Sequence, residues 1–415
     1  MLGRWGFESQ LDVLKRPRAS SHFSPPLCTA QQVVFLLFGT LPPPTFIVVH
    51  EAVCLSSQHS AVALGKQCLS QVSGVQCTRH LSSAAAPQPA VQNVKDPKTG
   101  IVLINMGGPG TIDEVHDYLL KIMTDRDMIQ LPVQSQLGPY IARRRTPEVQ
   151  KKYSEIGGGS PILKWTKRQG ELLCEKLDVL SPETAPHKYY VAFRYANPLT
   201  DVTLEEMEKD GLERAVLFSQ YPQYCCSTTG SSFNAIYKYY KDRKVPPGIK
   251  WSIIDRWSTH PLLAKTIAER IRTELKEFPE SIKKDVIIMF TAHSIPLRVV
   301  NRGDAYPSEV GYVRQGKKNF ILVPVAFVNE HIETLHELDI EYCHDLGKEL
   351  GVENIRRAAA PNDHPIFIDG LTDIVLNHLK SGPRISPKFL TRCPHCTNTR
   401  CEMSKSWFAQ LCSQQ

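Results

Sequence analysis

Three glutamates and two histidines lie close together about 80 residues before the end of this 415-residue chain. Glu333, Glu337 and Glu341 are four residues apart, so a helix would carry all three carboxylates on one face, beside His331 and His336. Like charges at this spacing repel by roughly 0.2–0.5 kcal/mol per pair unless a cation is present. Carboxylates and imidazoles are ligands that divalent metals accept, so the row predicts metal or proton handling. The alternative is a solvated acidic face.

A single histidine, His293, comes three residues after a short apolar run at residues 286–290. Because the ordinary pKa of histidine is about 6.5, a neutral imidazole at this position could accept a proton near pH 7. If the run is a parallel strand, His293 lies at the end of the sheet where ligands bind. A hydrogen-bonded structural histidine is the other interpretation.

Three of the 12 cysteines cluster near the C-terminus as Cys393, Cys396 and Cys401. In an intracellular protein this spacing indicates a metal site, either zinc or an iron–sulfur cluster, because thiolates bind both. Three thiolates need a fourth ligand. The candidates for it are Cys412, Cys225 and Cys226.

A glycine-rich turn at residues 107–110 could suggest phosphate binding. Neither G-x-G-x-x-G nor G-x4-G-K-[ST] is present, so a tight turn is the better interpretation. A second segment, residues 123–145, mixes apolar side chains with two prolines and ends in three consecutive arginines. It predicts core packing, a lip over a hydrophobic ligand, or a contact with an anionic membrane surface.

Continuous apolar runs alternate with helical patterns and would position these side chains. Such runs indicate strands buried on both faces, hence parallel sheets between helices. The helical patterns include residues 198–210 and 260–278. The fold class predicted is α/β with two doubly wound halves. The runs are residues 101–106, 189–193, 215–218, 251–254, 286–290 and 320–327.

The first 95 residues differ in charge from the remainder. They hold seven Lys or Arg against three acids, so the rest carries only about +3 of the formal +7, and nucleic-acid binding is not implied. No acid occurs between Glu51 and Asp96, which is typical of a mitochondrial transit peptide. An apolar stretch at residues 33–41 is cut by three prolines and is far shorter than the roughly 20 residues that a membrane helix needs.

Six segments in order make the chain from about Pro97 onward resemble ferrochelatases of animal mitochondria. The resemblance implies two Rossmann-like domains with parallel four-stranded sheets, insertion of ferrous iron into protoporphyrin IX, a homodimer, and peripheral association with the matrix side of the inner membrane. It divides the chain into a leader (1–95), a first domain with the lip (96–240), a second domain (241–383) and a cluster-binding extension (384–415). The segments are residues 104–109, 156–161, 193–195, 220–224, 292–294 and 331–335.

The resemblance also assigns site residues. It implies that the metal loses its ligands and the porphyrin loses two pyrrole protons, with an imidazole as acceptor. Arg145 would hold a propionate through its planar guanidinium. The implied catalytic residues are His293, Glu333, His260 and Asp373; the substrate contacts are Met106, Arg145, Tyr153, Ser160 and Arg194; the proton or iron path is His331, Glu337 and Glu341; and the ligands of a 2Fe-2S cluster are Cys226, Cys393, Cys396 and Cys401.

The chain departs from the family between Tyr306 and Gly316. Family members carry several tens of further residues there, including a helix and a strand, so we expect the second sheet to lose a partner strand. A splice variant or an incomplete gene model would explain the gap. One alternative function is a non-catalytic porphyrin-binding or dimer-forming isoform. Another is a zinc-stabilised nucleotide-binding enzyme, which the missing phosphate loop disfavours.

Overall fold

The computed structural model describes residues 33–38, 98–246, 248–293, 319–349, 352–396 and 398–413. Eight strands are present in these ranges: β1 (Val33–Phe38), β2 (Thr99–Asn105), β3 (His187–Phe193), β4 (Arg214–Ser219), β5 (Lys250–Ile254), β6 (Ile287–His293), β7 (Asn319–Pro324) and β8 (Asn354–Arg357). The main α-helices are α1 (Val115–Thr124), α2 (Gln134–Glu155), α3 (Ile162–Leu180), α4 (Thr200–Lys209), α5 (Ser231–Tyr240), α6 (Pro261–Lys276), α10 (Pro365–Ser381) and α12 (Thr399–Ser413). Short or non-α helices are η2 (Cys226–Gly230), η3 (Lys283–Asp285), η4 (Glu333–Leu346), α9 (Gly347–Glu349) and α11 (Pro387–Leu390).

The first sheet has the order β3-β2-β4-β5, and all its strands are parallel. Strand β2 is buried along its whole length, so both of its faces are covered. Ile101 and Leu103 pack in the core that contains α3, whereas Val102 and Ile104 pack in the core that contains α4, α5 and α12. This separation follows from the alternation of side chains along a strand.

The second sheet has the order β1-β6-β7-β8 and is also parallel. Helix α6 covers one face, where Ile271 packs with Ile288, Ile321 and Val323. On its outer side β6 is paired with β1, in register from Val33 opposite Ile288 to Phe38 opposite His293. The open edge expected from the missing segment is therefore occupied by a strand from the N-terminal part of the chain.

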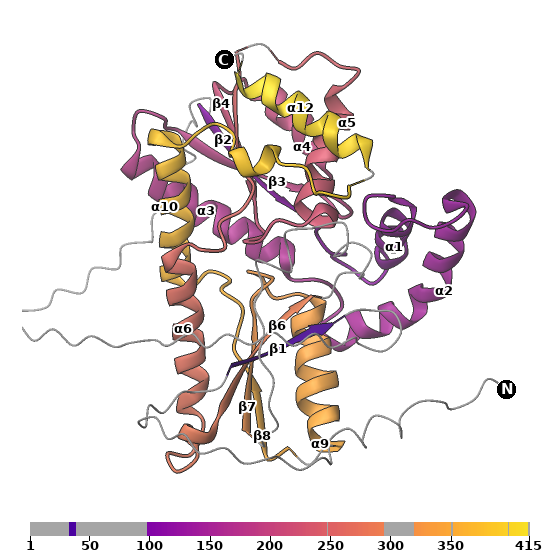
Figure 1. The fold of residues 1–415 in the computed structure, drawn as a ribbon, viewed down its shortest axis with the longest axis vertical. Coiled ribbons are helices and arrows are strands. Elements are labelled where there is room, and N and C mark those ends of the chain that lie inside the picture. The colour runs from indigo at the N-terminus through magenta and orange to yellow at the C-terminus, as the bar shows by residue number, and fades with distance from the viewer. Residues whose placement is uncertain are drawn as a thin grey trace, which may run out of the picture. The chain divides into compact units, whose positions relative to one another are not determined.

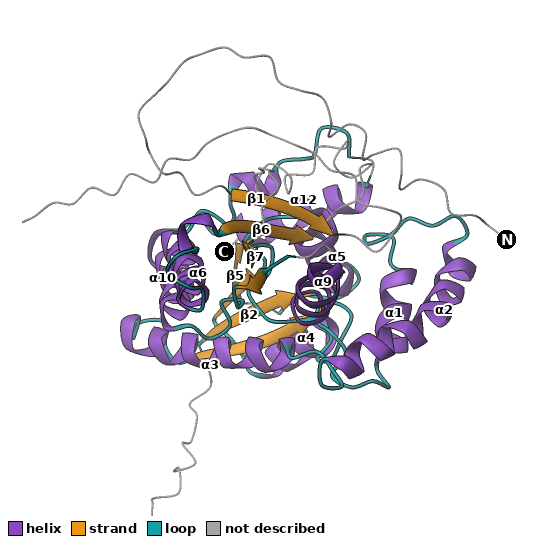
Figure 2. Cartoon of the chain, turned by 90° about the horizontal axis from the view of Figure 1, so that it is seen from below, coloured by secondary structure: helices purple, strands orange, loops and turns teal. Residues whose placement is uncertain are grey.

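Helices lie in layers around these sheets. Figure 1 shows α3, α4, α5 and α12 around β2, β3 and β4, with α6 and α10 running together along one side. Figure 2 shows the same pair, α6 and α10, side by side, and α3 lying along β2. The helices therefore cover both faces of the first sheet and one face of the second.

The predicted fold class, two parallel four-stranded sheets flanked by helices, is confirmed. The six apolar runs correspond to β2–β7, with ends that differ by a few residues. The stretch of residues 306–316, where the family gap is predicted, lies outside the described residues. Among the described helices, none combines the length and hydrophobicity that would let it cross a bilayer.

Candidate active site

His293 and Glu333 form a close pair at the end of the second sheet. His293 is the last residue of β6, Glu333 is the first residue of η4, and Nε2 of His293 lies 3.2 Å from Oε1 of Glu333. The histidine side chain is 43% exposed and the glutamate side chain 24%. Burial raises the pKa of Glu333 to about 8, so this carboxyl holds a proton near neutral pH. The pair can therefore exchange a proton between carboxyl and imidazole.

The helix that carries the glutamates is a π-helix rather than the α-helix expected from the sequence. Its i→i+5 hydrogen bonds widen each turn, and such helices are often found at functional sites. The carboxylates stay close enough to interact. Burial first, and the charges of Glu333 and Glu341 next, raise the pKa of Glu337 to about 7.

Helix α2 supplies the partners at the outer end of this row. The Lys152 ammonium donates to Oε1 of Glu341 at 2.7 Å, and Nδ1 of His336 lies 3.3 Å from the same oxygen. The other ring nitrogen of His336 lies 2.6 Å from Oε2 of Glu155. Among the residues with described positions, no three His, Cys, Asp or Glu side chains converge closely enough to hold one metal ion. The glutamate carboxylates therefore lie one after another along the helix and do not form a single set of metal ligands.

His331 is buried and differs from His293. Its Nδ1 accepts the backbone N–H of Glu333 at 3.1 Å, and its ring meets the edge of Phe327 with centroids 4.0 Å apart. Burial lowers the pKa of His331 to about 3, so the imidazole is neutral. The proton then sits on Nε2, which finds no partner among the described residues.

Tyr221 and Phe327, to which no role was assigned from the sequence, connect the ends of the two sheets. The Tyr221 hydroxyl accepts the backbone N–H of Met106 at 3.2 Å and donates to Oδ1 of Asn105 at 3.0 Å. Its ring contacts Phe327, whose ring contacts His293, with centroid separations of 6.4 and 6.3 Å. Met106 and His293 are therefore brought to the same region by two aromatic contacts.

Helices α1 and α2 form the neighbouring wall, which contains the predicted lip. Tyr153 is buried among apolar side chains of these helices, and Ile332, next to Glu333, packs against the same cluster. Burial raises the pKa of Tyr153 well above its usual range, so it stays neutral. Arg145 lies on α2 and is half-buried. The wall thus carries the half-buried Arg145, Lys152 in contact with Glu341, and a buried phenol.

The glycine-rich turn is a close-packing device. The Ser160 backbone N–H donates to the Pro109 carbonyl at 2.7 Å, and a Cβ on Gly108 would lie only 2.6 Å from the Ser160 hydroxyl oxygen. Gly107 has φ +77°, a conformation that favours glycine. The turn therefore fixes Ser160 beside Met106, as a tight turn was expected to do.

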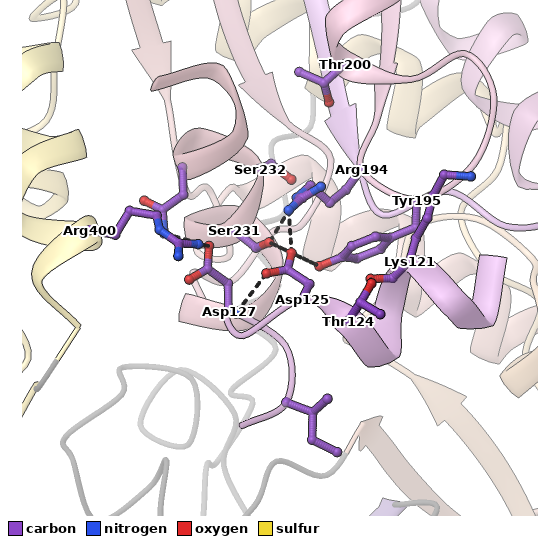
Figure 3. A network of polar contacts seen from close by, with 12 residues as sticks. Lys121, Thr124, Asp125, Asp127, Arg194, Tyr195, Thr200, Ser231, Ser232 and Arg400 are labelled. Atoms are coloured by element: carbon purple, nitrogen blue, oxygen red, sulfur yellow. Dashed lines mark hydrogen bonds and ion pairs between the residues drawn. The ribbon is translucent and has the colours of Figure 1, made fainter. Parts of the chain in front are cut away.

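Arg194 follows β3 and is held by a carboxylate that sequence reasoning missed. Its guanidinium pairs with Asp125 and donates from Nε to the Ser231 hydroxyl at 3.3 Å, while the Tyr195 hydroxyl donates to Asp125 at 2.8 Å. Figure 3 shows these groups converging on Asp125. Asp125 lies 208 or more positions before the acidic site residues predicted from the sequence, so spacing gave no signal for it.

His260 and Asp373 form a second histidine–carboxylate pair. His260 caps the start of α6, Asp373 lies in α10, and Nε2 of the histidine is 3.0 Å from Oδ2 of the aspartate. Their side chains are 15% and 49% exposed. The fold thus joins two residues that the resemblance named separately.

The cysteines predicted to hold a cluster gather between η2 and the C-terminal segment. Sγ of Cys226 lies 3.7 Å from Sγ of Cys393, and the other members of the cluster line one cavity of about 300 Å³ with Cys393. None of the described cysteines is in a disulfide. Cys412 is buried in the core of the first sheet instead. The fold therefore brings the four cysteines named by the resemblance into one region, with Cys226 in contact with Cys393, although the four sulfurs do not converge on one point.

Comparison with known proteins shows the family. A ferrochelatase family model matches residues 98–314 and 311–379. The chain is 63% identical over 357 residues to the mitochondrial ferrochelatase of Drosophila melanogaster, covering 76% of this chain and 93% of the fly protein. It is 48% identical over 371 residues to that of Homo sapiens, covering 80% of this chain and 88% of the human protein. The chain belongs to the ferrochelatase family.

The family match also bears on the predicted gap. It falls into two parts that meet at residues 311–314. The alignment with the fly ferrochelatase spans 357 residues, whereas 76% of 415 residues is about 315, so about 40 aligned positions have no counterpart here. The chain is therefore shorter than the fly ferrochelatase within the aligned part, and the position of the missing residues near 306–316 stays a prediction from the sequence.

Proposed function

We propose that this chain inserts ferrous iron into protoporphyrin IX to form haem. The observation that carries the proposal is the His293–Glu333 pair, in which an exposed imidazole contacts a carboxyl whose pKa is raised to about 8. Membership of the ferrochelatase family supports the same reaction. The comparisons do not support the non-catalytic alternative.

Insertion exchanges two pyrrole protons for Fe2+, so the site has to accept two protons. The His293 imidazole takes the two pyrrole protons one after the other. Each time, Glu333 first passes the proton it holds to Glu337 and Glu341 and then takes the proton that His293 releases from Nε2. The pKa values of about 8 and 7 for the first two glutamates lie near neutral pH, where a group both gains and loses protons readily. Lys152 stabilises the charged form of Glu341 at the end of the row.

The porphyrin lies between this row and the α1–α2 wall. Arg145 pairs with a propionate, because its guanidinium matches a carboxylate in two parallel hydrogen bonds. Met106, Tyr153, Ser160 and Arg194 line the remainder of the cleft. The neutral His331, whose Nε2–H finds no partner among the described residues, donates to an acceptor in the cleft. His260 and Asp373 supply a nitrogen and an oxygen ligand to incoming iron.

The test of this function is anaerobic incubation of the purified full chain with protoporphyrin IX and Fe2+, followed by the porphyrin absorbance. We expect the four-banded free-base spectrum to be replaced by that of haem. Retention of the free-base spectrum by a protein that quenches porphyrin fluorescence would contradict catalysis and support the non-catalytic isoform. The His344→Ala variant is the control for histidine substitutions, because this side chain is 74% exposed on the same helix, η4.

We further propose that Cys226, Cys393, Cys396 and Cys401 hold a 2Fe-2S cluster. When bound, the cluster supplies a covalent cross-link between η2 and the C-terminal segment. Thiolates at these positions support it, whereas the metal could also be zinc. Visible absorbance together with iron and sulfide content decides between them. Cys393→Ser should remove the absorbance, and Cys343→Ser, at a partly buried position elsewhere, should keep it; a colourless zinc-loaded protein would overturn the cluster.

The relatives are named mitochondrial ferrochelatases, and the leader has the charge bias of a transit peptide. We infer that the chain acts in mitochondria, as a homodimer on the matrix side of the inner membrane, with the lip against the lipid. Carbonate extraction of mitochondria tests the peripheral attachment, since an attached protein is released into the soluble fraction. Sedimentation of the mature protein tests the dimer.

A further inference from the structure

The turn between α1 and α2 carries two buried carboxylates that contact different parts of the molecule. The Asp125 side chain is 7% exposed and the Asp127 side chain 4%. The turn is closed by its own hydrogen bonds: Oδ1 of Asp125 accepts the Asp127 backbone N–H at 2.9 Å, and the Asp125 carbonyl accepts from Met128 and Ile129. The two carboxylates are therefore fixed relative to each other.

Asp125 faces the first sheet. It pairs with Arg194 and accepts from the Tyr195 hydroxyl, both directly after β3. Because a buried carboxylate without its cation is costly, Arg194 and Asp125 hold each other in place. Any displacement of the turn is thus transmitted to the guanidinium of Arg194.

Asp127 faces the cysteine segment, and two of its three partners, Asn398 and Arg400, lie between Cys396 and Cys401 in the sequence. It accepts from Asn398 at 3.1 Å, from Asn234 at 3.1 Å, and from Arg400 at 3.3 Å. Asn398 also accepts the Arg400 backbone N–H at 3.1 Å, which satisfies a donor at the start of α12. Arg400 directly precedes Cys401, and Figure 3 shows it beside Asp127 with Asp125 and Arg194 beyond.

We propose that Asp127 is a positioning residue that connects the C-terminal cysteine segment to the porphyrin cleft. Arg400 and Asn398 fix Asp127, the closed turn carries that position to Asp125, and Asp125 places Arg194. The functional part rests on the proposed role of Arg194 as a porphyrin contact. Anything that loosens the cysteine segment, including loss of its metal, would then loosen the cleft wall.

The test uses Arg400→Gln in the full chain, because this side chain is 43% exposed and its loss should leave the fold intact. Hydrogen exchange of the amides of residues 125–129 should become about tenfold faster, equivalent to ~1.4 kcal/mol. The KM for protoporphyrin should rise about threefold to tenfold while the KM for Fe2+ stays unchanged, since hydrogen bonds to a charged group contribute about this much. Arg400→Lys, which keeps the positive charge, should bring both the exchange rate and the porphyrin KM most of the way back to the wild-type values.

The matched control is Arg243→Gln. Arg243 and Arg400 line the same cavity of about 1140 Å³, but Arg243 pairs with the exposed Glu205 at 3.8 Å. It should leave exchange and both KM values unchanged. The proposal would be overturned if residues 125–129 exchanged at the wild-type rate in Arg400→Gln, or if Arg243→Gln changed the exchange rate equally.

The two proposals fail in different ways. If the wild-type protein is colourless but Arg400→Gln still shows faster exchange and a higher porphyrin KM, the cluster proposal is wrong and the proposed connection through Asp127 stands. A normal cluster content with no change in the variant removes the connection alone.

Discussion

The inner strands of the two sheets end in different kinds of polar group. At the first sheet, Gln220 donates to Gln169 at 2.8 Å and accepts from Thr166 at 3.0 Å, and Tyr221 is bonded to Asn105. These neutral side chains are buried and satisfy one another. At the second sheet, His293, Glu333 and Glu337 are titratable, and the pKa values of both glutamates are raised.

The two kinds of polar group are suited to different roles in the cleft. A buried amide network that is fully satisfied fixes a shape, because breaking any member leaves an unpaired group. Carboxyls with pKa values near neutrality change protonation during a reaction. We therefore interpret the first sheet as the rigid wall of the cleft and the second as the part that moves protons.

The strongest test of this division is His293→Ala. We expect iron insertion to fall by about 10²–10⁴-fold, the usual contribution of general acid–base catalysis, with porphyrin binding retained. The anaerobic spectrum and fluorescence quenching measure the two quantities. Turnover within a fewfold of wild type would place proton transfer elsewhere, and His344→Ala should match wild type.

The next effect concerns Glu333→Gln and pH. The folded pKa of about 8 lies above the ordinary value of 4.5, so its stabilising contribution is complete below pH 4.5 and is lost as pH rises through 8. Each pKa unit corresponds to about 1.4 kcal/mol, so the wild-type melting temperature should fall by several degrees between pH 5 and 8.5. The variant should show a smaller fall, the part due to Glu337 with its pKa of about 7, whereas Glu349→Gln, at an exposed position, should retain the whole of it.

Gln220→Leu should instead affect stability at every pH. It leaves Oε1 of Gln169 and the hydroxyl hydrogen of Thr166 without their partner, at a cost of about 1–3 kcal/mol, while the Gln169 amide nitrogen keeps its bonds to Asn329 and Asn362. Urea unfolding at pH 6 and pH 8 should show the same loss. A loss that depends on pH would mean that the first sheet is also coupled to titration.

The smallest effect is expected for Asp373→Asn. The amide keeps the shape but removes the charge beside His260, on a side chain that is 49% exposed. We expect the KM for Fe2+ to rise a fewfold with the porphyrin KM unchanged, in steady-state assays. A change confined to porphyrin would remove this pair from the iron route.

Much of the fold could be predicted because buried parallel strands leave continuous apolar runs. Strand β8 could not, since Asn354–Arg357 is short and polar and lies at a sheet edge. The π-helix geometry was also missed, because carboxylates spaced by four residues fit an α-helix equally well. The pattern located the glutamate row but not the wider turns that carry it.

The site was predicted in parts. His293 and Glu333 were predicted from their positions after strands and from the resemblance. Their 3.2 Å contact was not, because it joins two segments 40 residues apart. Asp125 and Asp127 lie on a turn and follow no period, so only the folded chain reveals their partners. Lys152 was missed for the same reason, since its partner Glu341 is 189 residues away.

The pairing of β1 with β6 has a consequence for the order in which the chain folds. Residues 99–254 contain every strand of the first sheet, so that sheet can close from local segments, whereas Val33 and its partner Ile288 are about 250 residues apart. A chain synthesised from its N-terminus makes β1 first and its partner strand much later. The second sheet is therefore the last to close, and because β1 lies within the proposed leader, cleavage of that leader would leave β6 as an open edge.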